Sequence, residues 1–149
     1  RLHSQPDSSK IWQKRTLMPT PYITKQEEDV PLQMRGKEVF KFAVGASTTE
    51  VEALLKEIGM SKSDVRFYMV HQANLRIIDA IKKYLDEPDE KFPVNIQDHG
   101  NSSSASCAIL LDECNRKGMF KPGDILVFSA FGAGLLSAAA VLEWESNFY

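Results

Sequence analysis

The sequence has few cysteines and histidines, and their spacing argues against several kinds of site. Among the 149 residues are two cysteines, Cys107 and Cys114, and three histidines, His3, His71 and His99. Both cysteines fall on one predicted helix, about 10 Å apart along its axis, which is too far for a disulfide bond. None of the five residues has metal-ligand spacing with another. We therefore expect two small buried thiols and no metal site.

An excess of charge of one sign is also lacking. The formal net charge is −2, which argues against bulk nucleic-acid binding but leaves room for a local basic patch. With 43% hydrophobic and 26% charged residues, the composition is that of one ordinary domain rather than a disordered chain. The start of the sequence has no signal-peptide pattern. We expect a cytoplasmic protein that binds neither nucleic acid nor membrane.

One uncharged run, ILVFSAFGAGLLSAAAVL at 125–142, is long enough to raise the possibility of a membrane helix. Gly132 and Gly134 divide it into two runs of strand length, and the turn sequence Pro122-Gly123-Asp124 precedes it. Two buried strands joined by a glycine-rich loop are therefore favoured.

The rest of the chain alternates strands with helices. Residues 1–30 are polar and proline-containing and are predicted to be an irregular connecting excursion, whereas 31–149 form the domain. Strands are predicted at 31–35, 66–71, 93–97 and twice within 125–142, and helices at 38–58, 72–85 and from Asn101 or Ser102 to Gly118. This order indicates an α/β fold with a largely parallel five-stranded sheet that ends in a hairpin.

The last predicted helix has unusually small side chains in its first two turns. Residues 102–108 are all Ser, Ala or Cys. A helix at a domain surface does not need small side chains on its outer face. We therefore expect this helix to lie between two layers, one of which the chain does not supply.

Three groups are predicted to meet at the carboxyl edge of the sheet, where open α/β folds bind ligands. His71 ends the strand in RFYMVHQANL, Asn101 follows VNIQDHG, and the FGAG loop covers 131–134. An imidazole N–H and a carboxamide NH₂ are both donors, and together they can form an oxyanion hole. Taken singly, each is better explained as structural, namely a structural histidine, a helix cap and a turn; the coincidence of all three at one edge favours a shared site as strongly as that structural interpretation.

Four segments, GKEVFKFAV, VHQANLRII, DHGNSSSAS and GDILVFSAFGAG, resemble the C-terminal half of β-ketoacyl-acyl carrier protein synthase III, a member of the thiolase superfamily. The resemblance covers nearly all of the chain and is weakest over 5–30. It implies a Cys-His-Asn site, in which His71 and Asn101 match the family's histidine and asparagine. It also implies a thiolase-like half-domain with a mixed five-stranded sheet, one half of an αβαβα sandwich.

The resemblance implies an acyltransferase of fatty-acid initiation, in which an acyl thioester condenses with malonyl-acyl carrier protein as carbon dioxide leaves. Acyl-CoA and the malonyl-carrier would be substrates, with no cofactor. The family's nucleophilic cysteine belongs to an N-terminal half that this chain lacks, so the chain alone is expected to be inactive. The complete enzyme is expected to be a homodimer. A non-catalytic thiolase-fold partner subunit of a condensing enzyme or polyketide-type synthase is the alternative.

Further positions match functional residues of the family. Those expected to line the pantetheine channel and the active-site end are Gly36, Phe40, Ala73, Asn74, Phe131 and Gly132. Those expected to dock an acyl carrier protein are Lys41, Arg76 and Lys83. The chain departs from the family at Leu136-Ser137, where a Trp-Gly pair is common, and at Tyr84, where another lysine is common. These departures concern the pocket wall and the docking surface.

Overall fold

In the computed structural model of the chain, residues 2–4, 35–133 and 135–145 are described. The helices and strands are β1 (Leu2–Ser4), α1 (Gly36–Glu57), β2 (Val65–Val70), α2 (Leu75–Leu85), α3 (Ile96–His99), α4 (Ser106–Arg116), β3 (Ile125–Gly132) and β4 (Leu136–Glu143). Three short 3-10 turns accompany them: η2 (Lys62–Asp64), η3 (Asp89–Lys91) and η4 (Ser103–Ala105).

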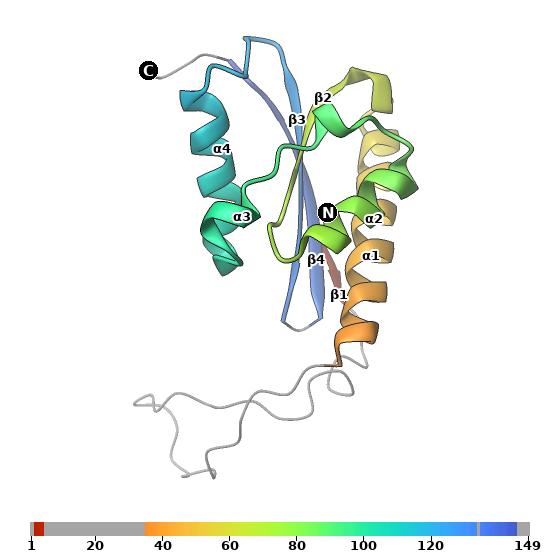
Figure 1. The fold of residues 1–149 in the computed structure, drawn as a ribbon. Helices are drawn as coiled ribbons and strands as arrows, with labels where there is room; N and C mark the ends of the chain where they lie inside the picture. Colours follow the sequence, from red (N-terminus) through yellow and green to blue (C-terminus); the bar gives the residue numbers. More distant parts are fainter. Residues whose placement is uncertain (1, 5–34, 134, 146–149) are drawn as a thin grey trace, which may run out of the picture.

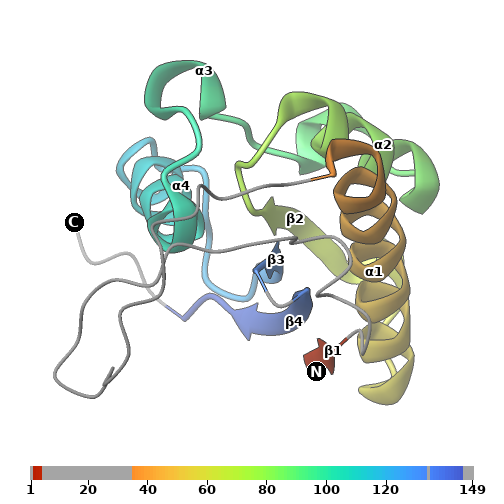
Figure 2. The same ribbon diagram turned by 90° about the horizontal axis from the view of Figure 1, so that it is seen from below.

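The strands form one mixed sheet between two helical layers. Its order is β1-β4-β3-β2, with β2 and β3 parallel and the other two pairs antiparallel. Helices α1 and α2 cover one face, and α3 and α4 lie on the other (Figures 1 and 2). The predicted α/β class, the mixed sheet and the terminal hairpin are confirmed.

Strand β2 is covered on both faces, which explains its nearly continuous apolar sequence. Tyr68 and Val70 join the core beneath α1 and α2, whereas Phe67 and Met69 join the core beneath α4. On α2, spacing of three and four residues directs one stripe inward, and its members Ile78, Ile81 and Leu85 are each 0% exposed. Each such side chain contributes about 2 kcal/mol through burial.

The helix boundaries follow local chemistry. Helix α1 ends just before Gly59, whose φ of +72° is a left-handed conformation that glycine adopts without strain. Helix α2 begins at Leu75, three residues later than predicted, because the Asn74 side chain caps it by accepting the Arg76 N–H at 2.9 Å. Within the described ranges, no helix is long and apolar enough to cross a membrane.

Several sequence predictions are wrong in detail. The segment 93–97 is not a strand: Asn95 precedes α3, and its N–H donates to a side chain rather than to a neighbouring strand. Four strands rather than five are seen in the described ranges, and only one pair is parallel. Strand β1 pairs with β4 at the start of the segment 1–30, and residues 5–30, which were expected to be irregular, lie outside the described residues. Residues 31–34 of the other predicted strand lie outside the described residues.

The small side chains that begin the last helix lie partly on the surface. Ser103, Ser104, Ala105 and Ala108 are exposed, whereas Ser106 and Leu110 face inward. The helix proper starts at Ser106, after η4, rather than at Asn101 or Ser102. In the part of the chain that the structure describes, α4 therefore packs against one sheet only.

Candidate functional site

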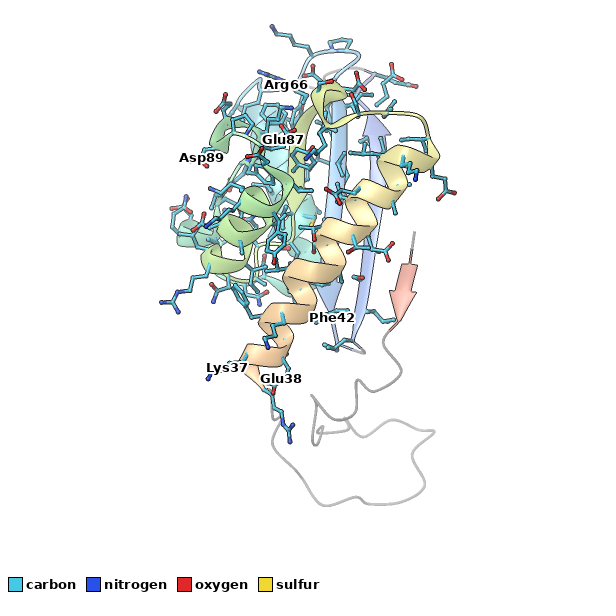
Figure 3. The ribbon with its side chains drawn as sticks, turned by 90° about the vertical axis from the view of Figure 1, so that its right-hand side faces the viewer. Lys37, Glu38, Phe42, Arg66, Glu87 and Asp89 are labelled. Atoms are coloured by element: carbon cyan, nitrogen blue, oxygen red, sulfur yellow. The ribbon has the colours of Figure 1, made fainter. Side chains whose placement is uncertain are left out.

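The carboxyl edge of the parallel strands gathers the beginnings of three helices. Strands β2 and β3 run toward the end of the fold at which α1, α2 and α4 begin (Figure 1). Figure 3 shows Lys37 and Glu38 at this end, and Arg66, Glu87 and Asp89 at the opposite one. Helix N-termini carry a partial positive charge, so this edge favours a ligand that is negative or becomes negative.

His71 lies at this edge, directly after β2. Its backbone N–H donates to the Ser129 carbonyl at 2.8 Å, which extends the ladder with β3 by one residue. The ring is half-buried and meets the Phe131 ring edge-on, with centroids 5.2 Å apart and planes at 64°. Burial lowers the pKa of His71 from its ordinary value of 6.5, so the imidazole is neutral near neutral pH.

Ser106, the first residue of α4, joins the His71 turn to the helix on the opposite face. Its Oγ lies 2.5 Å from His71 Nδ1 and accepts the backbone N–H of Gln72 at 3.3 Å. The side chain is 2% exposed. Sequence reasoning missed Ser106, although a signal was available: it is one of the few polar residues on the inward face of a helix with otherwise apolar contacts.

A hydrogen-bonded network holds the neighbouring segment against the end of β2. The buried Gln72 donates through Nε2 to the Val70 carbonyl at 2.8 Å and accepts the Asn95 N–H through Oε1 at 3.1 Å. Asn95 Nδ2 donates to Glu113 at 3.1 Å, and the other Glu113 oxygen pairs with His99 Nε2. The bonds from His99 and Asn95 lower the pKa of Glu113. This network, also missed from sequence, fixes the chain just ahead of Asn101.

Asn101 is exposed and lies between α3 and η4, so the prediction that it follows a strand is wrong. Its Oδ1 accepts the Ser103 N–H at 3.0 Å. This bond orients the carboxamide and leaves Nδ2 as the end that can donate to a ligand. Because Ser106 contacts both His71 and Gln72, the loop that carries Asn101 is tied to the turn that carries His71.

The other sequence-predicted site residues surround this edge from different elements. Phe131 contacts the His71 ring, and Gly132 follows it at the end of β3. The Ala73 N–H donates to the His71 carbonyl at 2.9 Å, and Asn74 caps α2. Gly36 and Phe40 come from the first turns of α1, and Phe40 is 37% exposed.

The two thiols are poorly suited to act as nucleophiles. Cys114 is buried, and burial raises its pKa to about 11. Cys107 is half-buried, burial raises its pKa as well, and its Sγ lies 3.8 Å from the Met69 carbonyl. Both thiols are therefore protonated at neutral pH. Among the described residues, no group of His, Cys, Asp and Glu is arranged to hold a metal ion.

The three basic residues singled out from the sequence are exposed on two packed helices. Lys41 lies on α1, and Arg76 and Lys83 lie on α2. Within the described ranges they form no ion pair, whereas the adjacent Lys82 pairs with Asp79 at 2.9 Å.

Comparisons with known proteins agree on one family. The model of "3-Oxoacyl-[acyl-carrier-protein (ACP)] synthase III C terminal" matches residues 55–144, more than half of the chain. A β-ketoacyl-[acyl-carrier-protein] synthase III of Helicobacter pylori (strain Shi470) is 39% identical over 141 residues, which are 94% of this chain and 43% of the relative. The chain thus spans less than half the length of this relative.

Solved structures give the same result. The β-ketoacyl-[acyl carrier protein] synthase III of Thermus thermophilus matches with a TM-score of 0.84 and 36% identity, over 97% of this chain and 44% of that one. The priming β-ketosynthase of the R1128 polyketide pathway matches with a TM-score of 0.73 and 36% identity, over 78% of this chain and 35% of that one. The fold is therefore thiolase-like.

Proposed function

The chain belongs to the family of 3-oxoacyl-[acyl-carrier-protein] synthase III C-terminal domains, and from this we propose that it is the C-terminal half of a condensing enzyme. In the proposed reaction, a cysteine of the N-terminal half holds an acyl group as a thioester. A malonyl thioester loses carbon dioxide, and the resulting carbanion attacks the acyl carbonyl carbon while the cysteine thiolate leaves. The product is a 3-oxoacyl thioester.

We assign the oxyanion hole to His71 and Asn101. When carbon dioxide leaves the malonyl group, negative charge develops on the thioester carbonyl oxygen, and two neutral N–H donors stabilise it. The observation that carries this assignment is the half-buried, neutral imidazole at the carboxyl edge, tied through Ser106 to the Asn101 loop. A charged imidazolium is not required for this role.

The substrate channel is proposed to approach this edge from α1 and α2. The contact of Phe131 with the His71 ring supports a place for Phe131 and Gly132 at the reacting end. Gly36, Phe40, Ala73 and Asn74 would line the pantetheine arm, and the exposure of Phe40 leaves an apolar ring available to it. The reaction needs acyl-CoA and malonyl-acyl carrier protein as substrates and no cofactor.

An acidic acyl carrier protein is the proposed macromolecular partner. Lys41, Arg76 and Lys83 are exposed and unpaired among the described residues, although the chain has a net charge of −2. Such a local basic surface steers an acidic partner and sets its orientation. The complete enzyme is proposed to be a homodimer.

The second half of the site is proposed to come from a cysteine-containing N-terminal half. Two observations support it: the chain covers 43% of the length of its Helicobacter pylori relative, and four small side chains of η4 and α4 (Ser103, Ser104, Ala105 and Ala108) lie exposed. Without that half, the raised pKa values of Cys107 and Cys114 leave the chain without a thiolate nucleophile.

The test combines this chain with the cysteine-containing half and separates acylation from malonyl decarboxylation. His71→Ala should reduce decarboxylation by about 10²–10³-fold, the usual loss of one oxyanion donor, and leave cysteine acylation intact. Asn101→Asp should be more damaging than Asn101→Ala, because it places a carboxylate beside the forming enolate. Gln97→Ala, an exposed change on α3, is the control. An Asn101→Asp variant as active as the wild type, with Asn101→Ala impaired, would leave Asn101 only the structural role of accepting the Ser103 N–H.

A priming synthase of polyketide assembly is the second candidate, since one such structure is as similar in sequence, at 36% identity, as the Thermus thermophilus enzyme. The chemistry at His71 and Asn101 would be the same. The two candidates differ in the carrier protein that they use. Steady-state rates with a fatty-acid carrier and with a polyketide carrier would separate them.

A further inference from the structure

The buried hydroxyl of Ser106 contacts His71 on one nitrogen only. The Oγ lies 2.5 Å from Nδ1, and it also accepts the Gln72 N–H at 3.3 Å. With 2% of the residue exposed, water has little access to this hydroxyl. The direction of the bond to Nδ1 decides which nitrogen of the neutral ring carries the hydrogen.

A count of donors and acceptors gives that direction. The Gln72 N–H can only donate, so it occupies one lone pair of Ser106 Oγ and leaves the single hydroxyl hydrogen to be placed. Among the acceptors that the described residues place near this hydrogen, His71 Nδ1 is the strongest. The Cys107 sulfur is also close, but thiol sulfur is a weak acceptor. The hydroxyl hydrogen therefore belongs on Nδ1.

Burial lowers the pKa of His71, so only one of its two ring nitrogens carries a hydrogen near neutral pH. We propose that Ser106 is a positioning residue, whose hydroxyl donates to Nδ1 and so holds His71 in the tautomer with its hydrogen on Nε2. The ring contact with Phe131 and the backbone bond to Ser129 restrict the ring and its backbone at the same time. Tautomer and orientation are thus set from two sides of the sheet.

The consequence for catalysis rests on the proposed function. An Nε2–H directed at the thioester oxygen is a donor, whereas a bare Nε2 presents a lone pair and repels the forming oxyanion. Removing Ser106 should therefore reduce decarboxylation by changing the proportion of the productive tautomer. A net hydrogen bond of ordinary strength corresponds to about a tenfold change in that proportion.

Nitrogen-15 NMR of the histidine rings tests the proposal on the full 149-residue chain, with no dependence on activity. Only three histidines are present, and His71→Gln assigns the His71 signals by their loss. The wild-type chain should show the hydrogen on Nε2. Ser106→Ala should shift the ratio toward the Nδ1 tautomer by about tenfold, Ser106→Thr should restore it, and the exposed Ser104→Ala should leave it unchanged.

A wild-type spectrum with the hydrogen on Nδ1 would overturn the proposal, even if no variant folded. An unchanged ratio in Ser106→Ala would overturn it as well. Decarboxylation assays on the chain combined with the cysteine-containing half distinguish a failure of the Ser106 proposal from a failure of the proposed function. A confirmed tautomer with no effect of His71→Ala on decarboxylation refutes the proposed function alone, whereas a decarboxylation loss in His71→Ala with no tautomer change in Ser106→Ala refutes the role of Ser106 alone.

Discussion

Replacement of Gln72 by methionine should destabilise the chain far more than the similar size of the two side chains suggests. The side chains are similar in length and volume, so the packing loss is small. Gln72 is 1% exposed, however, and its Oε1 is the acceptor for the buried Asn95 N–H at 3.1 Å. A buried donor that loses its partner costs about 1–3 kcal/mol, and loss of the bond to the Val70 carbonyl adds about 1 kcal/mol. We expect Gln72→Met to lower the free energy of unfolding by about 2–4 kcal/mol.

Urea unfolding followed by circular dichroism measures this loss, with the exposed Gln97→Met as control, for which we expect a change below about 0.5 kcal/mol. Amide hydrogen exchange adds a local measurement. The Asn95 amide should exchange much faster in Gln72→Met, while amides in the middle of β3 should report only the global change in stability. A Gln72→Met chain as stable as the wild type, with Asn95 still protected, would refute the view that this side chain anchors the segment before Asn101.

Three further predictions concern the surroundings of the site. Ser103 has a φ of +55°, so Ser103→Gly should raise the free energy of unfolding by about 0.5–1 kcal/mol, whereas Ser104→Gly should lower it; the reverse order would contradict backbone strain at Ser103. The pKa of Glu113 in the folded chain is lowered below its ordinary value of 4.5. Ionised Glu113 therefore contributes its full stabilisation of the folded state above pH 4.5, and this contribution is lost as the pH falls through the folded-state pKa. Glu113→Gln should flatten the pH dependence of unfolding in that acidic range, and an unaltered profile would refute the role of the pair with His99. In the enzyme formed by combining this chain with the cysteine-containing half, Arg76→Glu should weaken the use of malonyl-acyl carrier protein by roughly 1–3 kcal/mol, and the loss should depend on salt concentration. The use of malonyl-CoA should change little, and so should the use of either donor by the control variant Lys56→Glu. Equal losses with the two malonyl donors in Arg76→Glu would exclude a docking role.

The elements that could be predicted from the sequence are those whose cause is local. The inward stripe of α2 and the glycine-divided run that became β3 and β4 depend on residues a few positions apart, so periodicity and turn chemistry suffice. The position of His71 after β2 follows from the same pattern. Boundaries shifted where a cap decided them, as at Asn74.

The segment 93–97 shows why the rest could not be predicted. Proline, valine and asparagine at 93–95 are compatible with an extended strand, and the local pattern contains nothing against it. The partner of the Asn95 N–H is the Gln72 side chain, 23 residues earlier, and that pairing exists only after β2 and α4 have packed together. A buried side chain here replaces a strand neighbour, which no local rule anticipates.

The same distinction applies within the candidate site. His71 could be proposed as a donor from the sequence because its place at a strand end is a property of its own segment. Whether its Nε2 carries the hydrogen depends on Ser106, 35 residues later, on a helix that packs on the opposite face of the sheet from α2. An oxyanion hole needs both properties, a donor at the right edge and the right nitrogen protonated. Sequence pattern supplies the first, and only tertiary packing supplies the second, so residues such as Ser106 are where structure adds most to the functional assignment.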